Sequence, residues 1–80
     1  MSGPRILYIE DNPENRLLVR RILQAEGYTI VEAVDGPSGL EAARASPPDL
    51  ILLDINLPEM DGYELVGRLR QIPGLANTPI

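Results

Sequence analysis

The sequence predicts an α/β fold in which helices cover both faces of a parallel sheet, with the element order β-α-β-α-β-α. Three short apolar runs rich in β-forming residues alternate with segments whose apolar residues recur at helical spacing. The third run, "LILL", is apolar on both faces, as in strands that lie between two helix layers. Connections between parallel strands are almost always right-handed, which restricts the topology further.

The first predicted strand covers residues 5–9, and a helix follows over residues 13–26. Asn12 is a favourable N-cap, and Pro13 fits the first helical turn, where its missing N–H is not needed. Gly27 is a typical residue just beyond a helix C-terminus.

Apolar residues at helical spacing predict which face of this first helix packs on the sheet. They are Leu18, Ile22 and Ala25, with Leu17 and Leu23 widening the stripe. The charged residues off the stripe are Arg16, Arg20 and Glu26. We therefore expect the leucine and isoleucine stripe to be buried and the charged residues to face water.

The remaining elements follow from turn signals. The second strand is expected over residues 28–34, and the turn "DGPSG" leads to a helix that starts at Pro37 and stops before the Pro-Pro pair at 47–48. After the third strand and the loop "INLPEMDG", apolar residues on one side predict a third helix within 63–72. A fourth strand would begin at Ile80.

Composition excludes several classes of function. The 80 residues contain no cysteine and no histidine, so thiolate and imidazole chemistry is absent. The net charge is −5, which makes nucleic-acid binding by this segment unfavourable, because such binding depends on neutralising phosphates with Lys and Arg. All seven basic residues are arginine, so the chain contains no lysine. No apolar run reaches the roughly 20 residues of a membrane span, and "MSGPR" does not resemble a signal peptide. We expect a cytoplasmic protein without membrane contact.

Three acidic residues follow predicted strands. Glu10 and Asp11 come after the first strand and Asp54 after the third, so all three converge if the second and third strands flank the first. Clustered carboxylates raise one another's pKa, and a divalent cation removes that conflict. Oxygen ligands suit Mg²⁺, and one carboxylate could then attack phosphorus while another holds the metal. Taken separately, the acidic pair is equally well explained as a polar strand end, and Asp54 as a turn cap.

Four stretches resemble the receiver domain of two-component response regulators: "YIEDNPENR", "AVDGPSGLEAA", "PDLILLDINLPEMDG" and "YELVGRLR". The resemblance implies a flavodoxin-like three-layer fold with strand order 2-1-3. It also implies phosphorelay signalling, in which the domain accepts a phosphoryl group from a sensor histidine kinase or a phosphotransfer protein. Such a domain assists its own phosphorylation and dephosphorylation and is not otherwise an enzyme.

The resemblance assigns roles to residues of the site. Asp54 matches the phosphoacceptor, and Asp11 matches the acid that binds Mg²⁺ or Mn²⁺ directly together with Asp54. Glu10 matches a neighbour that acts through metal-bound water, although aspartate is more usual there. Asn56 matches the residue that offers the metal its backbone carbonyl.

The loop after the third strand also matches the family. Pro58 and Gly62 correspond to residues that shape the site loop. Met60 and Asp61 belong to the same loop, and we expect them to serve as packing and as a helix cap.

The resemblance ends before two family features. Receivers use a Thr or Ser at the end of strand four and a Lys at the end of strand five. Thr78 precedes the fourth strand, and the chain contains no lysine. Residues 1–80 are therefore expected to be the N-terminal part of one receiver domain, truncated and impaired in phosphorylation. Because strand three becomes an exposed apolar edge, we expect a homo-oligomer, most simply a dimer.

Two other functions compete with signalling. A phosphatase of the haloacid dehalogenase type also attacks with an aspartate, but it needs a second acid two residues later, where this chain has Asn56. A non-signalling fragment that only folds or assembles is the second alternative. A nucleotide-binding loop is less compatible, because such loops need a lysine.

Overall fold

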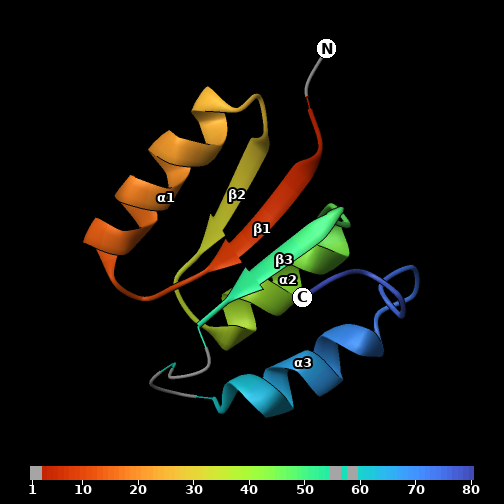
Figure 1. The fold of residues 1–80 in the computed structure, drawn as a ribbon. Coiled ribbons are helices and arrows are strands. Elements are labelled where there is room, and N and C mark those ends of the chain that lie inside the picture. Colours follow the sequence, from red (N-terminus) through yellow and green to blue (C-terminus); the bar gives the residue numbers. More distant parts are fainter. Residues whose placement is uncertain (1–2, 55–56, 58–59) are drawn as a thin grey trace.

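The computed structural model describes residues 3–54, 57 and 60–80. It has a three-stranded parallel sheet with the order β2-β1-β3 (Figure 1). The elements are β1 (Arg5–Ile9), α1 (Pro13–Ala25), β2 (Thr29–Ala33), α2 (Gly36–Ala45), β3 (Leu50–Leu53) and α3 (Gly62–Arg70). The predicted α/β class and element order are thus confirmed, and most predicted ends differ by one or two residues.

The start of α1 is fixed by its cap. The Oδ1 atom of Asn12 accepts hydrogen bonds from the N–H groups of Glu14, at 2.8 Å, and Asn15, at 3.1 Å. These bonds satisfy two N–H groups that have no partner within the helix. At the other end, Gly27 has a φ of 89°, a left-handed conformation that glycine adopts without steric cost. Both predicted end signals of α1 are therefore confirmed.

The predicted buried face of α1 is wrong. Leu18 is 60% exposed and Ile22 is 53% exposed. Arg16 and Arg20 instead face Glu32 of β2, with an Arg20 Nη1 to Oε2 distance of 2.7 Å and an Arg16 Nε to Oε1 distance of 3.9 Å. A half-buried carboxylate on the sheet face requires a cationic partner, and this requirement turns the arginines of α1 inward.

The hydrophobic core lies on the opposite face of the sheet, under α2 and α3. Its buried side chains come from all three strands, from both helices and from the segments that flank α3. They are Leu7, Ile9, Ala33, Leu40, Ala43, Ile51, Leu57, Leu65, Leu69, Ile72 and Leu75. Helix α2 lies very close to β1, because a Cβ atom placed on Gly39 would be 2.5 Å from Cδ1 of Ile9. This contact fixes the end of β1 from which the candidate site begins.

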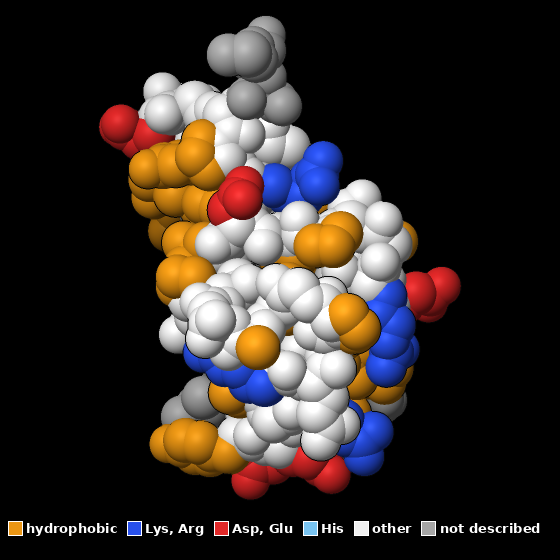
Figure 2. Space-filling view, turned by 90° about the vertical axis from the view of Figure 1, so that its right-hand side faces the viewer, with side chains coloured by type: hydrophobic (Ala, Val, Ile, Leu, Met, Phe, Trp, Pro, Cys, Tyr) orange, Lys and Arg blue, Asp and Glu red, His pale blue; other side chains and the backbone are white. Residues whose placement is uncertain are grey.

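The outer edge of β3 is less open than expected. The N–H of Ile51 donates a hydrogen bond of 2.9 Å to the carbonyl of Pro79, so this edge group has a partner. Leu50 and Leu52 are half-buried on the face away from the core. Figure 2 shows hydrophobic side chains gathered along its left edge, the side that faces the viewer in Figure 1. Apolar surface therefore remains exposed.

Helix α2 begins at Gly36, one residue before the predicted start, because Asp35 caps it. The Oδ1 atom of Asp35 accepts a 2.9 Å bond from the N–H of Ser38 and a 2.6 Å bond from its hydroxyl. The Ser38 hydroxyl, followed by its N–H, lowers the pKa of Asp35 below its ordinary value of 3.8. The charged cap is therefore favoured in the folded state.

This cap predicts a pH-dependent contribution to stability. Because the folded pKa of Asp35 is lowered, its contribution is present above the unfolded pKa and is lost as pH falls through the folded pKa. Asp35→Asn keeps a cap that does not titrate. In urea unfolding, the free-energy advantage of the wild type over this variant should be present at neutral pH and shrink well below pH 3.8. An advantage that is constant across this range would contradict the assignment.

Candidate active site at the carboxyl ends of β1 and β3

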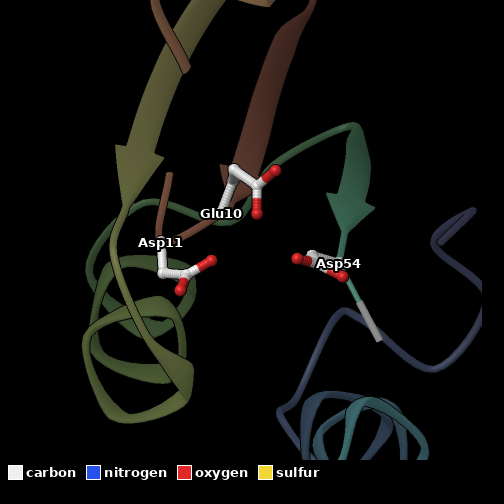
Figure 3. A group of neighbouring side chains, drawn as sticks. All are labelled: Glu10, Asp11 and Asp54. Atoms are coloured by element: carbon white, nitrogen blue, oxygen red, sulfur yellow. The ribbon is translucent and has the colours of Figure 1, made fainter. Parts of the chain in front are cut away.

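Three carboxylates meet at one edge of the sheet. Oxygen atoms of Glu10, Asp11 and Asp54 all lie within 4.8 Å of one another (Figure 3). Glu10 and Asp11 follow β1, and Asp54 follows β3, although 43 residues separate Asp11 from Asp54 (54 − 11). The structure thus brings together the three acids that the sequence singled out.

The backbone ladder of the sheet holds two of these acids. The N–H of Glu10 donates a 3.0 Å hydrogen bond to the carbonyl of Ala33, at the end of β2. The N–H of Asp54 donates a 3.1 Å bond to the carbonyl of Ile9, at the end of β1. Each bond extends the parallel pairing one residue beyond the strand, so the strand register determines the positions of Glu10 and Asp54.

Glu10 is the buried member of the cluster, with 6% of its surface exposed. Its Oε1 atom accepts a 2.8 Å hydrogen bond from Nδ2 of Asn15, and its carbonyl accepts a 2.8 Å bond from Nη1 of Arg16. Its Oε2 atom is buried and has no hydrogen-bond partner within the part of the chain that the structure describes. Burial, more than the nearby Asp54 and Asp11, raises the pKa of Glu10, and the Asn15 bond opposes this.

This donor set fits a divalent cation. Three carboxylates offer oxygen ligands only, which Mg²⁺ and Mn²⁺ prefer. The buried Oε2 atom of Glu10 also lacks the donor that a buried carboxylate oxygen normally has among the described residues. Burial, together with repulsion from Asp54 and Asp11, raises the pKa of Glu10, and a nearby cation would favour its charged form.

The loop between β3 and α3 is described in part. Gly62 is buried and begins α3, while Oδ1 of Asp61 accepts a 2.8 Å bond from the N–H of Tyr63, as expected of a cap. Met60 packs on the start of α2, because a Cβ atom on Gly36 would lie 3.0 Å from its sulfur. The expected packing and capping roles are therefore confirmed. The roles expected of Asn56 and Pro58 fall outside the described residues.

Asn15 and Arg16 were not among the predicted site residues. A signal was present in "EDNPENR", because a cap at Asn12 places Asn15 in the first turn of α1, which lies beside the strand end. The two hydrogen bonds to Glu10 themselves depend on how α1 is rotated against the sheet, and the predicted rotation was wrong.

Comparison with known proteins agrees with this geometry. Residues 6–80 match the family model described as "Response regulator receiver domain". A putative transcriptional regulator of Pseudomonas aeruginosa is 42% identical over 69 residues, which are 85% of this chain and 33% of that protein. The chain thus spans about a third of that relative's length.

Two solved structures extend the comparison. The receiver domain of the sensor histidine kinase PA1611 of Pseudomonas aeruginosa, with a magnesium ion coordinated in its active-site cleft, is 33% identical with a TM-score of 0.92, over 99% of this chain and 65% of that one. A chain of the complex of histidine kinase ThkA with response regulator protein TrrA is 38% identical with a TM-score of 0.80, over 85% and 59%.

These matches confirm the flavodoxin-like receiver fold and two-component signalling as the function of the family. They give no support to a haloacid dehalogenase type phosphatase or to a purely structural fragment. The converging acids, the β2-β1-β3 sheet and the family match lead to one conclusion: this chain belongs to the receiver-domain family of response regulators.

Proposed function

We propose that this chain accepts a phosphoryl group on Asp54 from the phosphohistidine of a histidine kinase or a phosphotransfer protein. In this step the P–N bond of the donor breaks, a P–O bond to a carboxylate oxygen of Asp54 forms, and the imidazole leaves with the electron pair. The observation that carries the proposal is the convergence of Asp54 with Glu10 and Asp11, with Asp54 only partly buried. The chain would act as a phosphoacceptor and not as a catalyst for other substrates.

The site residues would have different roles in binding the cation and in shaping the loop. Asp11, Asp54 and the backbone carbonyl of Asn56 would hold Mg²⁺ or Mn²⁺, and Glu10 would act through a metal-bound water. A bound divalent cation supplies charge neutralisation at the transferring phosphoryl group. Pro58 and Gly62 would shape the loop around Asp54. These roles are supported by the buried Oε2 atom of Glu10, which has no hydrogen-bond partner among the described residues.

Metal binding tests the cluster directly. We expect Asp11→Asn to weaken Mg²⁺ binding by about 10-fold or more, because the variant loses a charged oxygen ligand. Asp49→Asn is the matched control, since Asp49 lies at the other end of β3 and accepts a hydrogen bond from the N–H of Arg5. Titration of the three proteins with MgCl₂ by calorimetry measures the difference. Equal affinity in wild type and Asp11→Asn would refute the assignment.

The proposed partner is a histidine kinase. The similarity to a chain of the ThkA–TrrA complex supports it, because that complex joins a histidine kinase to a response regulator.

No helix in the described part of the chain is long and apolar enough to cross a membrane. We propose a cytoplasmic location for this chain, because one of its relatives is named a putative transcriptional regulator.

We also propose that the 80-residue chain forms a two-fold homodimer. Exposed Leu18 and Ile22 on α1, together with half-buried Leu50 and Leu52 on β3, provide apolar surface that a second copy would cover. Light scattering after size exclusion should give twice the monomer mass, and circular dichroism should show unfolding on dilution. A folded monomer that persists at low micromolar concentration would show the idea to be wrong.

A further inference from the structure

Glu10 is held at two points by the first turn of α1. Nδ2 of Asn15 donates to its side-chain Oε1 atom, and Nη1 of Arg16 donates to its carbonyl, each at 2.8 Å. Because Glu10 is only 6% exposed, its side chain has little room to adopt another rotamer. We call this pair of contacts the Glu10 tether.

The tether is anchored in the sheet. Arg16, which holds the carbonyl of Glu10, also approaches Glu32 of β2 at 3.9 Å, and Glu32 accepts a 2.7 Å bond from Arg20. Helix α1 is therefore fixed to β2 by charge on the same face that carries Asn15 to Glu10. This geometry orients the amide of Asn15 toward the carboxylate and leaves Oε2 as the oxygen without a partner in the described structure.

The number of free oxygens on a carboxylate affects which cation it suits. Ca²⁺ takes six to eight oxygen ligands and often binds both oxygens of one carboxylate. Mg²⁺ requires six ligands at shorter distances and keeps several waters. A glutamate with one oxygen already engaged is suited to the second arrangement and poorly suited to the first.

We propose that Asn15 is a specificity-determining residue of the metal site. It engages Oε1 of Glu10, so that Glu10 offers the cluster a single oxygen, and this favours Mg²⁺ or Mn²⁺ over Ca²⁺. The inference rests on one part of the proposed function, which is that the cluster of three acids binds a cation. It predicts that removing the amide of Asn15 increases Ca²⁺ binding relative to Mg²⁺ binding.

The test compares MgCl₂ and CaCl₂ titrations, by calorimetry, of the 80-residue chain and of Asn15→Leu. Leucine keeps the branch of asparagine at Cγ and has a higher helix propensity, but it has no hydrogen-bond donor. We expect the ratio of Mg²⁺ to Ca²⁺ affinity to fall by about 10-fold, the scale typical of residues that orient a metal ligand. Gln24→Leu, which removes an exposed amide from the same helix, should leave the ratio unchanged.

A double-mutant cycle separates this role from a general effect on folding. In the Glu10→Asp background the side chain is one methylene shorter, and we expect this to break the 2.8 Å bond from Asn15, so adding Asn15→Leu should not change the ratio further. An unchanged ratio in Asn15→Leu alone, with Mg²⁺ still bound, would overturn the inference and leave the proposed function standing. The same shift in both backgrounds would also overturn it. Failure of the wild type to bind either cation saturably would overturn both.

Discussion

Asp54→Asn is expected to abolish labelling of this chain by a small-molecule phosphodonor such as acetyl phosphate. The asparagine amide is not a nucleophile under these conditions, and the substitution also removes one of the two carboxylates that would bind the cation directly. Intact mass spectrometry after incubation with the donor and Mg²⁺ measures the covalent adduct. We expect a slow gain of one phosphoryl group in wild type and none in the variant.

The matched control is Asp61→Asn. Asp61 lies in the same loop but caps α3 by accepting a bond from the N–H of Tyr63, a role that asparagine also fills. This variant should label like the wild type. Slow labelling is expected because the chain contains no lysine to pair with the phosphoryl group, and preorganised charge is a large catalytic term. An adduct that forms on Asp54→Asn would show that another residue accepts the phosphoryl group. Rapid, complete labelling of the wild type would contradict the expected impairment of phosphorylation.

Leu65→Ala is expected to remove a large part of the stability of the fold. Leu65 of α3 is completely buried in the hydrophobic core, and a cavity at such a position costs about 2–5 kcal/mol. A small domain has about 5–15 kcal/mol of unfolding free energy in total. Urea unfolding followed by circular dichroism, at one fixed protein concentration, measures the change.

Tyr63→Ala provides the comparison on the same helix. Tyr63 is 74% exposed, so its removal should alter the free energy of unfolding by about 0.5 kcal/mol or less. If the two variants lost equal stability, the core could not lie where α3 packs on the sheet. The contrast therefore tests the packing that fixes α3 in the fold.

The elements of the fold were predictable because each depends on local signals. Apolar runs marked the strands, and Asn12 and Gly27 marked the ends of α1. Neighbouring residues determine these features. The strand order 2-1-3, which brings Asp54 to Glu10, is not local and was implied only by the family resemblance.

The rotation of α1 was not predictable in the same way. Its sequence carries an apolar stripe with Leu18 and a charged stripe with Arg16, and periodicity alone favours the apolar one. The charged stripe packs inward because Glu32 lies on the facing strand. The Asn15 contact with Glu10 follows from that rotation, so a correct reading of the site required the three-dimensional pairing of α1 with β2.

The backbone hydrogen bonds that hold Glu10 and Asp54 just beyond their strands limit which insertions and deletions the domain tolerates. Glu10 and Asp54 are bonded directly to the ends of neighbouring strands, so their separation depends on strand register and not on the length of the connections. An added residue in the connection after α1, near Gly27, would leave the three acids in place. Deleting one residue within β1 would shift its alternation and turn Glu10 toward the α2 face. Length variation compatible with phosphotransfer should therefore be found between the elements and not within the strands.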